Sequence, residues 1–256
     1  MRHFLLLAMI AMLTVVAPVL AQAPPAQVLQ AIEQAGRFSD TFVGSYRLTV
    51  NAVISKTNGT VTDEDLTDMA VSRSVDGIQQ ETILRATKNG KDTTAESRAE
   101  QAKRKAKDLG KTKRNEKKTS DGEISVGLKI PGPKTADSFV YQALASEHGA
   151  CRVGYSPNQE HQKDEGISKG ELAWKCDTLD PLWATAELVD LPSHVSEMKA
   201  RLEFARDGGT AYMSRLTTDG AGGILFIKRK FHMMMEISDL VPSPAPSVPA
   251  GSSVSR

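Results

Sequence analysis

Residues 223–240, GILFIKRKFHMMMEISDL, have the two-residue period of a β-strand with one buried face. Every second residue from Leu225 belongs to an apolar set that contains a single arginine: Leu225, Ile227, Arg229, Phe231, Met233, Met235 and Ile237. The residues between them are mostly polar. Such a strand spans roughly 50 Å, far more than the usual five or six residues, and strands of that length bend. The stretch therefore predicts a curved antiparallel sheet around something apolar.

Arg229 is the one charge on the apolar side of this stretch. Two interpretations are open. A β-bulge near residues 228–230 would turn Arg229 to the polar face, because a bulge shifts the alternation by one residue. Alternatively, Arg229 reaches a carboxylate inside the fold. The bulge is the simpler interpretation and is slightly favoured.

The composition is that of an ordinary globular protein. The chain has 256 residues, a formal net charge of +1 and 25% charged residues, and it is long enough for one good core. The balance of charge gives no sign of nucleic-acid binding. Aromatic residues make up 5% of the chain, which leaves few platforms for stacking bases or sugars.

The first 21 residues are predicted to be a cleaved signal peptide. Arg2 and His3 precede a long run of apolar and small residues, 4–19, and small residues then suit cleavage after Ala21. An uncleaved anchor is the alternative, but it needs about 20 apolar residues, and the run is slightly shorter. We therefore expect export to the periplasm, or else secretion.

The two cysteines, Cys151 and Cys176, are predicted to form a disulfide, because an isolated pair in an exported chain is most simply bonded. Two free buried thiols are the alternative. Neither a reactive thiol nor a zinc site is expected, since no neighbour suggests a lowered pKa and no Cys-x-x-Cys pair is present.

Residues 22–242 are predicted to form a single, mainly β (α+β) domain, and residues 243–256 a disordered tail rich in proline and serine. A short amphipathic helix should begin after Pro24 and Pro25 and end at Gly36. Asn58-Gly59, Asp76-Gly77 and Asn89-Gly90 are turn pairs at hairpin-like spacing. Strands are expected at 42–55, 66–75, 79–87, 126–130, 151–156, 170–177, 182–191, 195–205 and 211–217, with 138–145 either strand or helix and 219–223 a turn.

A basic helical insertion is predicted at residues 91–118, which contain eleven basic and five acidic residues. The helix has almost no apolar face, so a solvated insertion is the simpler interpretation. The alternative is a basic arm that docks on an anionic membrane surface or an acidic protein. Nucleic acid is not expected, because no aromatic residue is interleaved with the charges. The arm consists of Lys103, Arg104, Lys105, Lys107, Lys111, Lys113 and Arg114.

No familiar catalytic, nucleotide-binding or metal-binding motif occurs in the sequence, and no catalytic residue, cofactor or metal is expected. His161, with Glu160, Asp164 and Glu165, is the best metal-like cluster, but neighbouring loop residues of this kind are usually solvated. His232 lies on the polar side of residues 223–240. It is expected to point outward and not to act as a base.

The second half of the chain resembles the periplasmic lipoprotein-carrier family, the outer-membrane lipoprotein-sorting proteins. The residues that bear the resemblance are RVGYSP at 152–157, GELAW at 170–174, Asp180-Pro181 leading into Leu182, and the closing strand 231–239. The resemblance implies an open half-barrel with one or two helices packed on its concave side and an apolar cavity for acyl chains. The basic insertion and the cysteine pair depart from the family pattern.

The resulting hypothesis is a non-enzymatic periplasmic protein that binds or carries acyl chains of lipids or lipoproteins. The residues expected to line the cavity are Leu225, Ile227, Phe231, Met233, Met235, Leu202 and Phe204. Methionine adapts to irregular partners, so the run 233–235 suits either a pocket or, more simply, core filling. The alternatives are an envelope scaffold that uses the basic insertion and, less favoured, a hydrolase with scattered catalytic residues.

Overall fold

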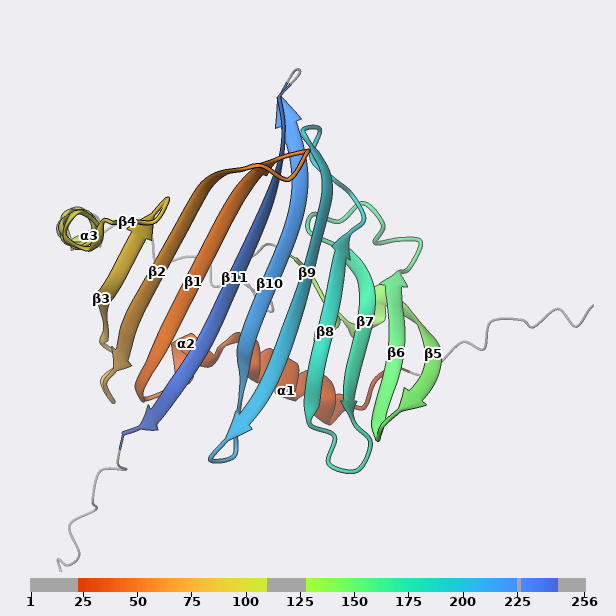
Figure 1. Ribbon diagram of the computed structural model, residues 1–256. Helices are drawn as coiled ribbons and strands as arrows, with labels where there is room; N and C mark the ends of the chain where they lie inside the picture. Colours follow the sequence, from red (N-terminus) through yellow and green to blue (C-terminus); the bar gives the residue numbers. More distant parts are fainter. Residues whose placement is uncertain (1–22, 110–127, 225–226, 244–256) are drawn as a thin grey trace, which may run out of the picture.

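The computed structural model describes residues 23–109, 128–224 and 227–243. They form one antiparallel sheet of eleven strands, in the order β4-β3-β2-β1-β11-β10-β9-β8-β7-β6-β5 (Figure 1). The outermost strands, β4 and β5, do not pair, so the sheet is an open half-barrel, as the sequence predicts. The strands are β1 Gly44–Lys56, β2 Val61–Arg73, β3 Gln79–Lys88, β4 Lys91–Asp92, β5 Phe139–Glu147, β6 Ala150–Pro157, β7 Ser168–Lys175, β8 Pro181–Leu188, β9 Val195–Asp207, β10 Thr210–Ile224 and β11 Ile227–Pro242.

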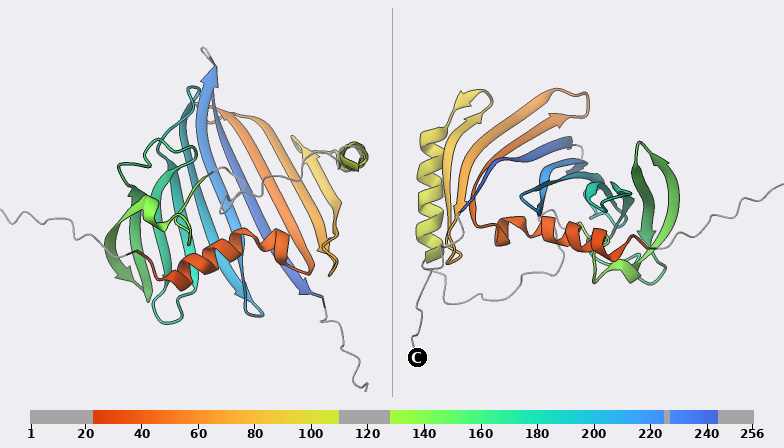
Figure 2. Two further views of the ribbon diagram at one scale, coloured as in Figure 1. Left: turned by 180° about the vertical axis from the view of Figure 1, so that it is seen from behind. Right: turned by 90° about the horizontal axis from the view of Figure 1, so that it is seen from below.

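The helices occupy two different places on the sheet. Helix α1, Ala26–Gly36, crosses one face of the sheet, and the short α2, Phe38–Thr41, follows it (Figures 1 and 2). Helix α3, Thr94–Leu109, lies beside the edge strand β3 instead. A single 3-10 turn, η1 Ala136–Ser138, precedes β5. We call the face that carries α1 the inner face and the opposite one the outer face.

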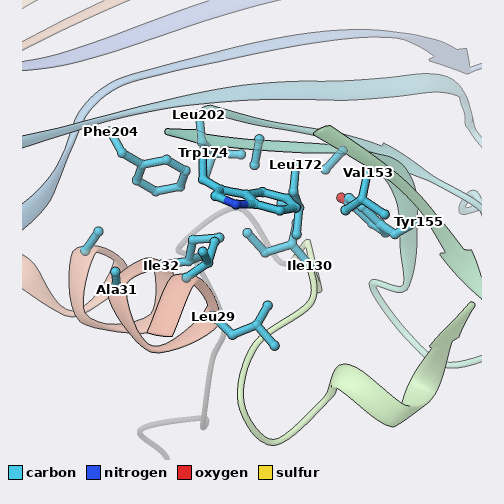
Figure 3. Packing of buried hydrophobic residues seen from close by; sticks show 14 of the residues in the cluster. Leu29, Ala31, Ile32, Ile130, Val153, Tyr155, Leu172, Trp174, Leu202 and Phe204 are labelled. Carbon is cyan, nitrogen blue, oxygen red and sulfur yellow. The ribbon is translucent and has the colours of Figure 1, made fainter. Parts of the chain in front are cut away.

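The main core lies between α1 and strands β5–β10. The spacing of Val28, Ile32 and Ala35 places them on one side of α1, and all three are buried. They pack against inward residues of the sheet such as Leu202 and Trp174 (Figure 3). The segment that ends at Ile130 adds further apolar side chains to this cluster. Burial of the apolar side of α1 thus fixes the helix across the strands.

The cysteine pair forms the expected disulfide between the start of β6 and the residue after β7. Cys151 and Cys176 are bonded, and the Cys176 N–H donates to the Gly149 carbonyl at 3.0 Å. The bond therefore joins two strands that already pair along their length.

We expect the double substitution Cys151→Ser with Cys176→Ser to lower the free energy of unfolding by about 3 kcal/mol, because opening this loop returns entropy to the unfolded chain. The loop spans 25 residues. Urea denaturation of the oxidised parent and of the double variant measures the difference. A parent whose stability is unaffected by dithiothreitol would contradict this prediction.

Residues 223–240 do not form one strand. Ile224 pairs with Ile227, so β10 ends at Ile224 and β11 begins three residues later. The expected turn at 219–223 was wrong, because these residues are the last part of β10. The expected bulge was also wrong: β11 keeps its register with β10 and with β1 around Arg229. The Arg229 side chain reaches the Lys228 carbonyl at 3.4 Å and no carboxylate among the described residues.

Two further predictions differ from the structure. Of the expected strand 126–130, the described part makes only an isolated bridge, between Lys129 and Ile167, and serves as a core segment. The ambiguous stretch 138–145 is the edge strand β5. The predicted signal peptide, residues 1–21, and the predicted tail except Ser243 lie outside the part that the structure describes.

Candidate functional site

The register of the sheet brings side chains from four central strands into rows on the inner face. The first row joins Met198 of β9, Phe231 of β11 and Ile54 of β1, with Gly220 of β10 between the first two. The second row has Ala200, Thr218, Met233 and Ala52, and the third has Leu202, Leu216, Met235 and Val50. Residues that are far apart in the sequence thus form one apolar surface.

The side chains become less buried from the third row, which lies under α1, to the first row, which lies farthest from it. In the third row Leu202 is 1% exposed and Leu216 is completely buried, because both lie in the core under the helix. In the first row Met198 and Phe231 are half-buried, and Ile54 is 41% exposed. We call the six residues Met198, Phe231, Met233, Val50, Ala52 and Ile54 the apolar strip. All six side chains are apolar, and the next residues of the first two rows are Asp63 and Asp65 of β2.

Phe231 shapes the strip by lying against Gly220 on the neighbouring strand. A Cβ atom built on Gly220 would lie 1.9 Å from Phe231 Cε1. The aromatic ring therefore occupies the space that a side chain at Gly220 would need. Such aromatic cover of a glycine is a known way of stabilising a weak point in a sheet.

The strip has one orphaned polar group within its rows. Thr218 is fully buried, and its Oγ1 has no hydrogen-bond partner among the residues that the structure describes. A buried hydroxyl without a partner is unusual, because burial without a hydrogen bond costs free energy. The hydroxyl lies in the second row, between Ala200 and Met233.

The structure places the residues expected for the cavity in two environments. Leu202 and Phe204 belong to the core cluster, and Met235 packs against that cluster. Phe231 and Met233 lie in the apolar strip. Leu225 and the side chain of Ile227 lie outside the part that the structure describes. Sequence periodicity could not find Met198 and Ile54 as members, because strand register, not spacing along the chain, brings them beside Phe231.

The outer face has the opposite character. Ion pairs cross it from strand to strand, as between Arg215 Nη1 and Glu203 at 3.5 Å and between Arg215 Nη2 and Glu236 at 3.2 Å. Between β1 and β2, Arg47 Nε donates a hydrogen bond to Asp68 at 2.7 Å. This hydrogen bond lowers the pKa of the Asp68 carboxyl, so Asp68 stays charged although it is buried. Most of these pairs are solvated and contribute little to stability.

The histidine candidates lie on polar surface. His232 points to the outer face, as expected, and its Nδ1 lies 2.8 Å from Asp219. His161 lies 2.9 Å from Asp164 in the loop before β7. Within residues 23–109, 128–224 and 227–243, no group of three His, Cys, Asp or Glu side chains could hold a metal ion.

Part of the basic insertion at residues 91–118 has a structural role. Arg98 and Lys105 of α3 donate to backbone carbonyls of β3, and Arg104 pairs with Glu100 at 2.7 Å on the helix itself. Lys103 is exposed. Lys111, Lys113, Arg114 and the side chain of Lys107 lie outside the described part, so the docking role of the arm stays a prediction.

No family model and no curated protein matches the chain. Among solved structures, a LolA superfamily protein from Nitrosomonas europaea is 13% identical, with a TM-score of 0.35 over 88% of this chain and 96% of that one. A DUF1329 family protein from Desulfovibrio piger is 11% identical, with a TM-score of 0.35 over 88% and 95%. A putative outer membrane lipoprotein-sorting protein domain from Vibrio parahaemolyticus is 10% identical, with a TM-score of 0.34 over 84% and 92%.

The first and the third of these structures carry the name of the group that residues 152–240 resemble. At such identities and TM-scores the likeness says nothing about a ligand. The ligand has to be inferred from the side chains of the sheet.

Proposed function

We propose that the protein is a non-enzymatic binding or carrier protein for acyl chains of lipids or lipoproteins in the bacterial periplasm. The observation behind this proposal is the apolar strip, which continues the core beyond α1 as half-buried side chains. A single soluble domain gains nothing from a contiguous uncharged strip in this position, whereas a ligand-binding surface needs one.

The side chains of the strip suit a flexible chain of methylene groups. Met198 and Met233 are unbranched and polarizable, so they adapt to an irregular apolar partner. Val50 and Ile54 extend the surface across β1.

The disulfide supports an oxidising compartment, since such bonds persist mainly in exported proteins. The predicted signal peptide points the same way. Within the described ranges, no helix is long and apolar enough to cross a membrane.

Binding of a fluorescent fatty acid to the protein without residues 1–21 tests the proposal. We expect saturable binding, and at least a tenfold loss of affinity in Met233→Glu, because a carboxylate in the strip would be desolvated by the bound chain. Met234→Glu is the matched control, since Met234 is also half-buried but faces outward beside Thr217 and Asn51. Both variants should keep the circular dichroism of the parent.

A series of saturated fatty acids sharpens the test. Each additional buried methylene should strengthen binding by up to roughly fourfold, because its burial contributes about 0.8 kcal/mol. The proposal would be wrong if affinity did not depend on the length of the fatty acid, or if no fatty acid bound at tens of micromolar. Turnover of ester or peptide substrates that disappears in His232→Ala would instead favour a hydrolase.

A further inference from the structure

The two edges of the sheet differ in whether their outward backbone groups have hydrogen-bond partners. Along β3, helix α3 supplies partners for the edge: Thr94 bonds with the Ala86 backbone, Arg98 with the Ile83 and Leu84 carbonyls, and Lys105 with the Glu81 carbonyl. The two-residue strand β4 pairs beside them. Covering an edge in this way prevents unwanted strand pairing.

The other edge, β5, has no such cover. Seven of its nine residues pair with β6 on one side, with an irregularity between Leu144 and Glu147, and no described residue bonds to its free side. Side chains there are exposed, among them Val140 at 44%. The strand contains no charged residue or proline before Glu147. It therefore lacks the lysines, prolines and inward charges with which proteins usually protect an edge.

A groove of about 740 Å³ runs beside β5 on the outer face. One wall is formed by Val140, Gln142 and Leu144 of β5, and the opposite side includes Lys199 and Arg201 of β9. Residues separated by three intervening strands share this groove, so the outer face is hollowed here. Its volume is within the range of ligand-binding clefts, roughly 300–1,000 Å³.

The charges that line the groove are already paired within the protein. Lys169 lies 3.6 Å from Glu187, Lys199 lies 2.7 Å from Glu197, and Arg201 lies 3.1 Å from Glu203. Glu171 accepts from Arg152, and Asp219 contacts His232. A charged ligand would have to compete with these partners. Among the described residues, the groups left without a partner here are the backbone N–H and C=O groups on the free side of β5.

We propose that β5 and this groove form a docking site for an extended polypeptide segment of another protein, which adds to the sheet as a twelfth strand. Only a polypeptide brings a row of N–H and C=O groups with the spacing of an edge strand, as in other β-augmentation complexes. Alternate side chains of the segment would continue the wall formed by Val140, Gln142 and Leu144. The segment should be uncharged where it meets this wall.

A second copy of the chain is the alternative occupant. It would pair the nine residues of β5 with the same residues of the other copy, and the test distinguishes this dimer from a bound peptide. The site is on the opposite face from the apolar strip, so the two proposals can fail separately.

The test uses the protein without residues 1–21 and a fluorescein-labelled octapeptide, Lys-Thr-Val-Thr-Val-Thr-Val-Lys, followed by fluorescence polarisation. We expect binding that is lost when alternate backbone nitrogens of the same peptide are methylated, because methylation removes donors but keeps the side chains. Hydrogen exchange should slow at residues 139–147 when the unmodified peptide is present. Val140→Lys should weaken binding at least tenfold.

Leu84→Lys is the matched control, because Leu84 is also 44% exposed and lies on the covered edge strand β3. It should leave peptide binding unchanged. Equal binding of the methylated peptide, equal loss in both lysine variants, or protection centred on β1 and β11 would overturn the proposal. So would a dimer in sedimentation equilibrium that Val140→Lys dissociates, since the edge would then belong to a second copy.

Discussion

Gly170→Ala is expected to lower the free energy of unfolding by about 3 kcal/mol or more, the upper range for overpacked interiors. Gly170 lies in β7 under the backbone of β8. A Cβ atom built on it would lie 2.0 Å from the Thr185 carbonyl oxygen and 2.7 Å from the Thr185 carbonyl carbon. Because both of these atoms belong to the backbone, no side-chain rotation can relieve the clash.

A buried tyrosine stabilises the close approach between Gly170 and the backbone of Thr185. Tyr155 lies opposite Gly170 on β6, and its hydroxyl donates to the Thr185 carbonyl at 2.7 Å. Burial raises the pKa of Tyr155 well above its usual value, so the hydroxyl keeps its proton for this bond. The Thr185 carbonyl of β8 thus accepts the hydrogen bond from Tyr155 and also leaves no room for a side chain at position 170.

Gly154→Ala is the matched control for this prediction. Gly154 is on β6, next to Tyr155, but the nearest atoms to an added Cβ are 3.9 Å away, which is ordinary contact. We expect a change within about 1 kcal/mol, possible in either direction because alanine also restricts the unfolded chain. Urea denaturation of both variants checks the pair. Equal stability of Gly170→Ala and the parent would show that β8 does not approach β7 as described.

Leu202→Ala is expected to cost 2–5 kcal/mol, the range for removing a buried leucine side chain. Leu202 is 1% exposed and lies between Ala184 and Leu216 in the core cluster that α1 covers. The substitution removes apolar burial and leaves a cavity that a helix lying across several strands cannot easily fill. Thermal and urea denaturation measure the loss.

Lys199→Ala on the same strand serves as the control, with an expected change below about 1 kcal/mol, since Lys199 faces outward in an exposed pair with Glu197. The result for Leu202→Ala also shows whether Leu202 fills the core or lines a ligand cavity. If Leu202→Ala leaves stability unchanged but weakens fatty-acid binding, the residue lines an open ligand cavity and does not fill the core.

Several local features follow directly from the sequence. The alternation at Phe231, Met233 and Met235 places these residues on one face of β11, and the structure pairs them with the apolar residues Ile54, Ala52 and Val50 of β1. The helix ending at Gly36 and the turns at Asn58-Gly59 and Asp76-Gly77 also occur as predicted. These features are predictable because periodicity and turn chemistry act over a few residues.

The glycines of β10 show where local reasoning fails. The sequence 219–223 suggests a turn, yet Gly220 and Gly222 are strand residues. Gly220 makes room for the Phe231 ring, and a Cβ on Gly222 would lie 2.4 Å from the His194 carbonyl oxygen. Both glycines are needed for close approach to residues distant in the sequence, and a single sequence does not distinguish this need from turn chemistry.

By itself, the sequence determined that the chain builds a mainly β domain with a disulfide and that β11 has an apolar face, because these depend on side-chain period and cysteine count. Only the tertiary structure decided that the strand at residues 223–240 begins late and keeps its register past Arg229. It also decided that Met198 and Ile54 lie beside Phe231, and that α1 covers Leu202 but leaves the apolar strip half-buried. Strand register and helix placement depend on contacts between distant residues, which no local pattern specifies.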